Sequence, residues 1–312
     1  MRYQQYLNQE TIHKRRRCEK ISEISNQPTY KRQRFLLAFL RQLNDGVTAT
    51  DLQKLVFLHT MTEGSDFYEF VPYKFGSYSF QLKEDLDILQ RDGFATLEYM
   101  QDSTRIKAFG DFPRGASFRI APERGNALIR RAYREYPYYA INSEITKKLF
   151  HGEELERFNN SKQAYTKTGQ VLFTIGYEGK SIEAFINTLI QNDIRLLCDV
   201  RKNPLSRKFG FSKKKLEHIT QTVGIRYVHI PDLGIDSDKR SSLETAEEFQ
   251  SLFEDYAKTL PRRNEFLEGI YTLLRTNTRI ALMCFEREPE MCHRHVIRDY
   301  IAKTYQVRSQ DL

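Results

Sequence analysis

The feature that most constrains the fold of this chain is an alternation of short apolar runs with amphipathic segments, which begins near residue 170. The apolar runs are nearly continuous, as is typical of parallel strands covered on both faces. They occupy residues 171–175, 194–200, 225–230 and 279–285. Apolar residues between the runs recur at three- and four-residue spacing, which predicts helices that bury one face. This alternation predicts an α/β domain with a Rossmann-like, mostly parallel sheet.

The preceding part of the chain has a different pattern. Helical spacing begins at Tyr30, and further helices are expected from about residue 48 and over 79–91. A predicted β-hairpin follows, with strands at 94–99 and 105–109, and then a third extended piece at 117–120. This order of helices and hairpin resembles winged-helix domains, so an α+β, winged-helix-like domain is expected before the sheet.

The length of the chain also favours two domains, because 312 residues exceed the usual size of one. A polar stretch at 151–169 separates the two patterns and is interpreted as a linker. We therefore expect a basic N-terminal arm at 1–29, a winged-helix-like domain at 30–150 and an α/β domain at 170–312.

Positive charge is concentrated near the N-terminus. The formal net charge is +8, and among the first forty residues nine are Lys or Arg while three are acidic. Such an arm is attracted to polyphosphate, so we expect a nucleic-acid partner, double-stranded DNA in particular. The nucleic-acid-binding candidates are Arg15, Arg16, Arg17, Arg105 and Lys107.

The predicted third helix gives a competing interpretation of this half. It carries Glu84, Asp85 and Asp87 beside its basic residues, which is not the face of a strong groove binder. Contact with the nucleic-acid backbone is therefore favoured over readout of bases. A protein-interaction role and a homodimer remain open alternatives.

Composition predicts the cellular setting. No apolar run of about 18 residues exists, so no membrane contact is expected, and the N-terminus lacks the apolar stretch of a signal peptide. Four cysteines are too few for a disulfide scaffold and fit a reducing compartment. The expected location is the cytoplasm.

Polar and glycine-rich clusters follow all four predicted strands of the α/β domain. The carboxyl ends of parallel strands share one edge of a sheet, which is where ligands bind. The catalytic candidates at this edge are Asp199, Glu286, Glu178, His293 and Cys284. The candidates for substrate binding are Gly176, Tyr177, Arg201, Arg207, Cys292 and Arg294.

Several of these clusters carry a family resemblance. They include Asp-Val-Arg at 199–201 and Cys-His-Arg at 292–294, with further motifs at 174–179, 203–207, 209–213 and 224–234. In this order they resemble the domain-of-unknown-function family numbered 488 over about residues 170–312. The resemblance implies no settled activity. Fusion to a winged-helix-like domain resembles architectures found in bacterial defence and mobile-element settings.

Cations around carboxylates suit a phosphate-bearing substrate held near an acid or base. We therefore expect a nucleic-acid-associated enzyme, hydrolase- or N-glycosidase-like, with a role in bacterial defence or modified-base processing. One alternative is a non-catalytic DNA-binding regulator that senses a nucleotide-like ligand. Another is a rhodanese-like sulfurtransferase, because Cys284 at a strand end resembles the position of that nucleophile.

No cofactor and no metal are expected. The turn at 176–179 is too short for a dinucleotide fingerprint. The spacing of Cys284, Cys292, His293 and His295 matches no familiar zinc pattern. A structural ion pair between Asp199 and Arg201 is the alternative to a catalytic role for these two residues.

Overall fold

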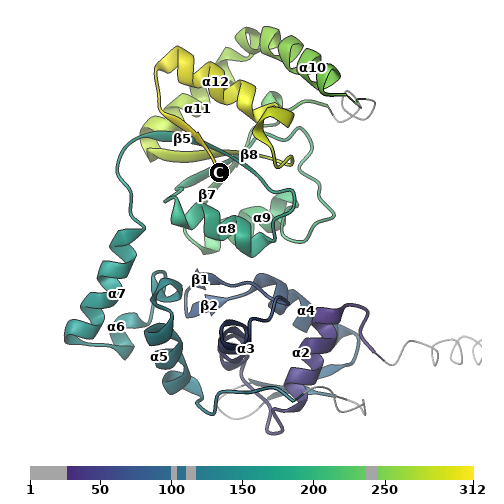
Figure 1. Ribbon diagram of the computed structural model, residues 1–312, viewed down its shortest axis with the longest axis vertical. Coiled ribbons are helices and arrows are strands. Elements are labelled where there is room, and N and C mark those ends of the chain that lie inside the picture. The colour runs from purple at the N-terminus through teal and green to yellow at the C-terminus, as the bar shows by residue number, and fades with distance from the viewer. Residues whose placement is uncertain (1–26, 100–103, 110–116, 237–242, 244) are drawn as a thin grey trace, which may run out of the picture. The chain divides into compact units, whose positions relative to one another are not determined.

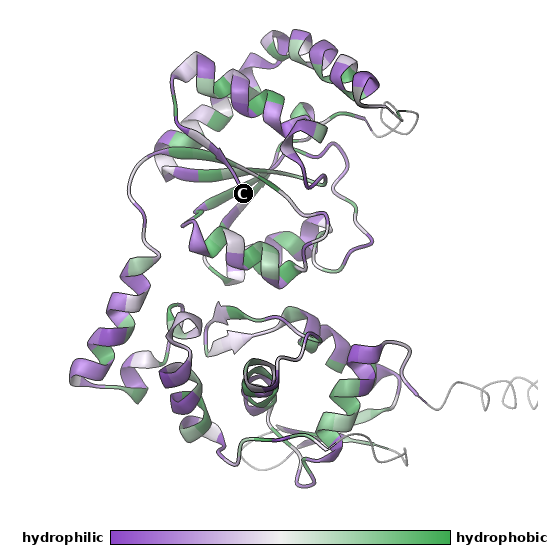
Figure 2. Cartoon of the chain, in the orientation of Figure 1, coloured by the Kyte–Doolittle hydropathy of each residue, from purple (hydrophilic) through white to green (hydrophobic). Residues whose placement is uncertain are grey.

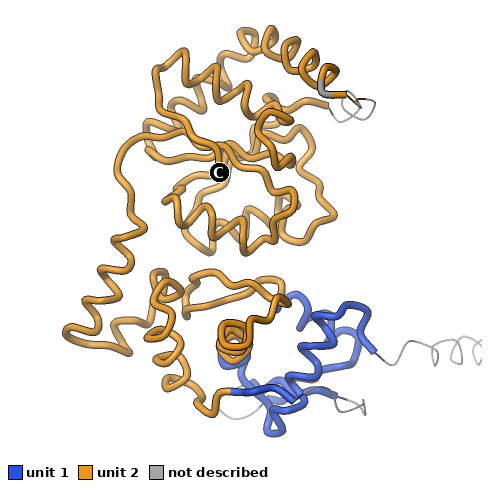
Figure 3. Tube along the Cα trace, viewed as in Figure 1, with its two compact units in different colours: residues 1–52, 82–120 blue, residues 53–81, 121–312 orange. Residues whose placement is uncertain are grey.

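The computed structural model describes residues 27–99, 104–109, 117–236, 243 and 245–312. Contacts within the chain divide it into two compact units. One unit comprises Met1–Leu52 with Leu82–Ile120, and the other comprises Gln53–Gln81 with Ala121–Leu312 (Figure 3). The chain passes from one unit to the other three times: inside helix α3 (Ala49–Glu63), inside helix α4 (Phe80–Arg91), and between Ile120 and Ala121.

The predicted helices and hairpin of the N-terminal half are present. Helix α2 spans Lys31–Arg41 and buries one face through Phe35, Leu36 and Phe39. Strands β3 (Ala95–Tyr99) and β4 (Thr104–Ala108) pair antiparallel, and β4 also forms a bridge from Ile106 to Val47. The resemblance to winged-helix domains stays a prediction.

The expected third extended piece at 117–120 was wrong, because these residues form no strand. The ring of Phe118 lies 5.2 Å from that of Phe35 in an edge-on contact. The backbone N–H of Phe118 donates to the side chain of Gln42 rather than to a strand. The alternating pattern therefore reflects one aromatic anchor on α2, not a sheet.

The remaining elements before residue 170 include a short hairpin between the second and third helices, which was not predicted. Its strands are β1 (Val71–Tyr73) and β2 (Gly76–Tyr78). Helix α5 (Gly125–Glu135) and the short α6 (Thr146–Leu149) follow. The segment predicted as a linker contains a helix, α7 (Gly152–Ala164).

The C-terminal region is α/β, as predicted, with a five-stranded sheet in the order β7-β6-β8-β5-β9 (Figure 1). Every neighbouring pair in this sheet is parallel. The strands are β5 (Val171–Gly176), β6 (Leu196–Asp199), β7 (Arg226–His229), β8 (Arg279–Cys284) and β9 (Ser309–Asp311). The edge strand β9 was not predicted, because its three residues are polar.

Helices cover both faces of this sheet, as Figure 1 shows. Helices α8 (Ile182–Gln191) and α9 (Lys213–Thr222) pack on one face, against Phe173, Ile175 and Leu197. The opposite face carries Leu172, Leu196 and Cys198. The helices on that face are α10 (Ala246–Thr259), α11 (Asn264–Asn277) and α12 (Arg294–Tyr305).

The hydropathy of the strands follows from this double cover. Strands β5, β6 and β8 are buried along their whole length, and Figure 2 shows them mostly hydrophobic, while the surrounding helices alternate in character. Among the described residues, no helix combines the length and apolar character that crossing a membrane requires.

Candidate active site at the carboxyl edge of the sheet

The alternation of side chains along each strand separates the predicted site residues into groups. Asp199 at the end of β6 lies two positions after Leu197 and so shares its face of the sheet, which α8 and α9 cover. Cys284 at the end of β8 lies two positions after Leu282 and shares the opposite face. The two residues therefore end neighbouring strands at one edge but serve different faces of the sheet.

The first group is a buried ion-pair group, formed by Asp199, Arg201, Tyr177 and Tyr227. The guanidinium of Arg201 donates to both oxygens of Asp199, from Nε at 2.8 Å and from a terminal nitrogen at 2.5 Å. Its other terminal nitrogen donates to the hydroxyl of Tyr177 and to the carbonyl of Phe211, both at 3.0 Å. The hydroxyl of Tyr227 donates to Asp199 at 2.6 Å. Asp199 is 0 % and Arg201 is 5 % exposed.

These contacts hold both charges in place. Burial acts to lower the pKa of Arg201, but the hydrogen bonds and charge of Asp199 outweigh it, so this pKa is raised. Burial, together with the charge of Asp199, raises the pKa of the Tyr227 hydroxyl. The arrangement supports the ion-pair alternative for Asp199 and Arg201 over direct contact with a substrate.

Arg294 also donates hydrogen bonds to other groups of the protein. Its guanidinium donates to the hydroxyl of Thr174 and to the backbone carbonyls of Glu286 and Arg287. This fully buried side chain thus joins β5 to the loop after β8. Gly176 belongs to the same joint, because a Cβ atom there would lie 1.9 Å from the carbonyl oxygen of Glu286. Both residues therefore shape the loop.

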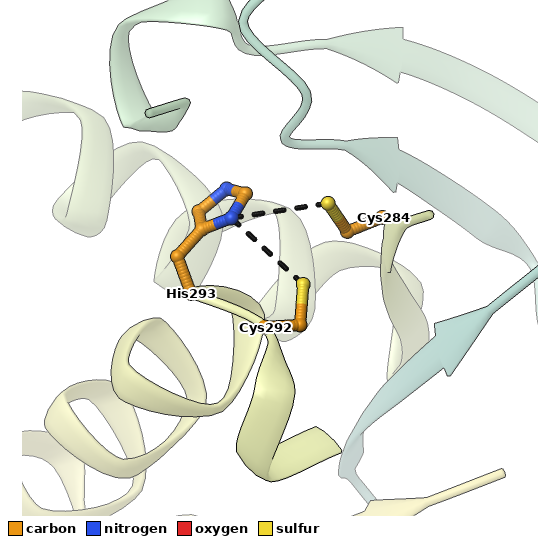
Figure 4. Close-up of side chains that lie close together, drawn as sticks. All are labelled: Cys284, Cys292 and His293. Atoms are coloured by element: carbon orange, nitrogen blue, oxygen red, sulfur yellow. Dashed lines mark hydrogen bonds between the residues drawn. The ribbon is translucent and has the colours of Figure 1, made fainter. Parts of the chain in front are cut away.

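The second group is a thiol–imidazole cluster, formed by Cys284, Cys292 and His293. Cys284 ends β8, while Cys292 and His293 directly precede α12. Nδ1 of His293 lies 3.8 Å from each of the two sulfur atoms (Figure 4). On the other side of the ring, Nε2 lies 3.0 Å from the carbonyl oxygen of Val200, in the loop after β6.

The cluster is buried, with Cys284 2 %, Cys292 0 % and His293 1 % exposed. Burial acts to raise the pKa of Cys292, but hydrogen bonds with Cys284 and His293 and the charges of His293 and Arg294 lower it well below its ordinary value. A nucleophilic sulfur must be reached by both its sulfur donor and its sulfur acceptor, and this degree of burial restricts that access. It therefore weighs against the sulfurtransferase alternative.

The third group is a cationic rim, in the loop after β6 and the first turn of α9. No acidic residue occurs between Asp199 and Glu217, although this stretch holds seven Lys and Arg residues. Arg201 is buried in the ion-pair group, and the other six are exposed or half-exposed. They are Lys202, Arg207, Lys208, Lys213, Lys214 and Lys215.

The rim is folded against the strand ends rather than extended away from them. The ammonium of Lys208 donates to the carbonyl of Tyr177 at 3.3 Å, and partial burial lowers the pKa of Lys208. Nζ of Lys213 lies 3.2 Å from Nδ1 of His229 at the end of β7. Only glycine fits at position 234, because a Cβ atom there would lie 2.2 Å from the backbone nitrogen of Lys202.

One predicted carboxylate, Glu178, lies beside this rim, and a second, Glu286, lies in the loop after β8. Glu178 is exposed and accepts a hydrogen bond from the backbone N–H of Arg287 at 3.0 Å. Burial lowers the pKa of Lys208, and the charge of Glu178 offsets part of that effect. Glu286 is half-buried in the loop that Arg294 holds. Of the predicted acids and bases, Glu178 is thus the best placed to meet a solvent-borne substrate.

The nucleic-acid-binding candidates of the N-terminal half have mixed surroundings. Arg15, Arg16 and Arg17 lie outside the described residues. Arg105 donates to the carbonyl of Asp45. Lys107 forms an ion pair with Glu98 at 2.8 Å across the hairpin, which offsets part of its charge.

Some contributors to the site were not predicted. Tyr227 donates to Asp199, and the Val200 carbonyl faces His293. Tyr227 could have been found, because residues 197 and 227 are paired and Asp199 lies two positions further along the same face. The Val200 contact leaves no sequence signal, since any residue offers a carbonyl.

The close approach of Cys284, Cys292 and His293 was also not predicted from the sequence. A tight turn at Pro289–Met291 returns the chain from the end of β8 to the start of α12, which brings residues eight and nine positions apart together. His295, weighed with them on spacing, instead faces the carbonyls of Pro289 and Cys292.

Comparison with known proteins supports the resemblance drawn from the motifs. Residues 181–301 match the model of a family described as Domain of unknown function DUF488. No curated protein and no solved structure gave a significant match to the chain. The matched range runs from the start of α8 to within α12 and includes the rim, the ion-pair group's Asp199 and Arg201, and the thiol–imidazole cluster. Most of the α/β region of this chain is therefore similar to the DUF488 family.

Proposed function

We propose that this protein is a nucleic-acid-associated enzyme whose C-terminal domain binds and hydrolyses a phosphate-bearing nucleotide or nucleic acid. The bond cleaved is a phosphodiester or an N-glycosidic bond. The observation that carries the proposal is the cationic rim. Six exposed or half-exposed cations follow β6 without an intervening acid, at the edge of a parallel sheet where ligands bind.

Helix α9 adds to the attraction for an anion. Its first turn contains Lys213, Lys214 and Lys215, and its N-cap Ser212 makes no capping hydrogen bond with its side chain. Backbone N–H groups at a helix N-terminus favour negative charge, and here they coincide with three ammonium groups. Phosphate is the biological anion that such a surface recognises best.

Glu178 is the proposed general base, because it lies beside Lys208 and is held by the backbone N–H of Arg287. Asp199 is given a positioning role instead, since the guanidinium of Arg201 and the hydroxyl of Tyr227 occupy its oxygens. Glu286, His293 and Cys284 are not needed for the proton transfer in this scheme.

The proposal extends to the partner and location. Duplex DNA is the proposed partner of the N-terminal half, through its basic arm at residues 1–29 and the hairpin residues Arg105 and Lys107. The cytoplasm is the proposed location, because Cys198, Cys284 and Cys292 are not joined in disulfides. A role in bacterial defence or modified-base processing stays a prediction from the fusion of the two halves.

The binding part is tested by neutralising rim charges in the full chain. The triple variant Arg207→Ala, Lys213→Ala, Lys214→Ala is compared with Arg262→Ala, Arg275→Ala, Lys303→Ala, which removes three exposed charges elsewhere in the same domain. Fluorescence anisotropy with labelled duplex and single-stranded oligonucleotides is measured over a range of salt concentrations. We expect the rim variant to lower the salt slope of log K for duplex by about 2–3, and the matched control to leave it unchanged. Equal slopes for both variants would remove the rim from the binding site.

The catalytic part is tested by turnover of the native chain and of Glu178→Gln. We expect the variant to reduce the rate of product formation about 10²–10⁴-fold while binding changes little, because only the proton transfer is removed. If the native chain binds through the rim but forms no product from DNA, RNA or nucleotides, the enzyme is excluded. The non-catalytic regulator then becomes the better account.

A further inference from the structure

We propose that Cys284, Cys292 and His293 bind one thiophilic divalent metal ion of the zinc type through two sulfur atoms and the imidazole Nδ1. This site is separate from the cationic rim, and the inference does not depend on the substrate or reaction proposed above.

The distances between the donor atoms fit a single ion. Nδ1 lies 3.8 Å from each sulfur, and all three donor atoms lie within 4.8 Å of one another. With Zn–S bonds of about 2.3 Å and Zn–N bonds of about 2.0–2.1 Å, tetrahedral geometry separates sulfur and nitrogen by about 3.6 Å. Figure 4 shows the two sulfurs and the ring nitrogen converging on a common space. Small side-chain movements would therefore complete the coordination.

The hydrogen bonding of His293 favours the tautomer in which Nδ1 can bind a metal ion. A backbone carbonyl can only accept, so the contact of 3.0 Å with Val200 places a hydrogen on Nε2. In the neutral ring, Nδ1 then carries a lone pair directed at the sulfurs. Metal-binding histidines are commonly oriented in this way, with the second ring nitrogen donating to a carbonyl or carboxylate. The Val200 carbonyl thus acts as a positioning group.

The types of donor in the cluster point in the same direction. Thiolate is the form of cysteine that binds metal, and soft thiolates with imidazole select zinc and similar ions.

The scaffold holds the donors rigidly. Cys284 ends a fully buried central strand, and Cys292 and His293 lie at the start of a twelve-residue helix that packs on the same face. The rings of Tyr256 and His293 meet edge to face with their centroids 5.6 Å apart, which further restricts the imidazole. Among the described residues, three side chains supply the cluster, so water or a bound molecule would occupy the fourth position.

The test uses the full chain, purified without metal-affinity resin or chelator. Metal content is measured by inductively coupled plasma mass spectrometry. The metal-stripped chain is then titrated with Co²⁺ and followed by absorption spectroscopy. We expect about one zinc per chain, and Co²⁺ is expected to give thiolate-to-metal charge-transfer bands with intense tetrahedral d–d bands. Cys284→Ser and His293→Gln should lose the zinc and these bands, whereas Cys198→Ser, a matched buried cysteine, should keep both.

Three results would overturn the proposal. The first is native chain with far less than one zinc that also gives no thiolate bands with Co²⁺. The second is a Cys284–Cys292 disulfide found by mass spectrometry in the chain as purified under reducing conditions. The third is a Cys198→Ser variant that loses metal as fully as Cys284→Ser. Because the first two readouts use the native chain, a variant that fails to fold does not obscure them.

Discussion

The ion-pair group and the thiol–imidazole cluster end neighbouring strands of one sheet, yet their polar atoms are arranged in opposite ways. In the ion-pair group, each nitrogen of Arg201 donates to a protein oxygen, and both oxygens of Asp199 accept. In the cluster, two sulfurs and the Nδ1 of His293 face one another. The first arrangement is complete as it stands, whereas the second has the geometry of a set of ligands.

The difference teaches that residue type and position at a strand end do not by themselves identify a site. Asp199 and Arg201 look catalytic in the sequence, but their charges are used to hold the loop after β6 in place. Buried, fully hydrogen-bonded charges of this kind contribute to structure, and removing one partner is costly because the other charge remains.

The largest expected effect is the loss of Arg201. Arg201→Leu leaves the carboxylate of Asp199 buried without its guanidinium, so the free energy of unfolding should fall by about 3–5 kcal/mol. Denaturant unfolding followed by circular dichroism measures this change. The double variant Asp199→Asn, Arg201→Leu should recover part of the loss, because it removes the buried charge. A loss below about 1 kcal/mol for the single variant would mean that the pair is not structural.

The next effect concerns a buried carboxyl that is held by neutral donors instead of a guanidinium. Glu183 on α8 accepts from the backbone N–H of Gln81 and from the hydroxyl of Ser79. Burial raises its pKa from 4.5 to about 7. Between these two values the folded chain keeps a proton that the unfolded chain has lost, so stability falls as pH rises through this window.

Glu183→Gln stays neutral and should remove this pH dependence. We expect the variant to match the native chain near pH 5 and to exceed its free energy of unfolding by about 2–3 kcal/mol at pH 8. Urea unfolding at several pH values is the measurement. A difference between the two chains that stays constant with pH would show that Glu183 does not titrate in this range.

The smallest effect comes from the edge of the ion-pair group. Tyr227→Phe removes one hydrogen bond to Asp199 but leaves the guanidinium contacts, so we expect a loss of about 1–2 kcal/mol. Thermal unfolding detects a change of this size. A loss equal to that of Arg201→Leu would mean that the phenol of Tyr227 contributes as much to stability as the ion pair does.

Much of the C-terminal fold could be predicted from the sequence. The strands β5, β6, β7 and β8 and their helices follow directly from buried runs and helical spacing. The edge strand β9 could not, because Ser309–Asp311 is short and polar and is held by pairing with β5 rather than by burial. The piece at 117–120 was wrongly taken as a strand, since the spacing of Phe118 reports an aromatic contact.

The candidate site was predictable in part. Polar residues at four predicted strand ends indicated one edge of the sheet, and the structure brings these ends together because the strands are parallel. The division of these residues into separate groups depends on how the loops fold back. Nothing in the spacing of Cys284, Cys292 and His293 shows that a turn at Pro289–Met291 brings them together.

The comparison between the two buried groups is tested most directly by titrating the chelator-stripped chain with zinc while its thermal unfolding is recorded. At a hundredfold excess over Kd, zinc should raise the free energy of unfolding by about 2.7 kcal/mol. For a domain of this size that corresponds to roughly 5–10 °C in Tm. Cys284→Ser should not respond, whereas Tyr227→Phe should gain as much as the native chain. Equal responses of the native chain and Cys284→Ser, or none from either, would contradict the account.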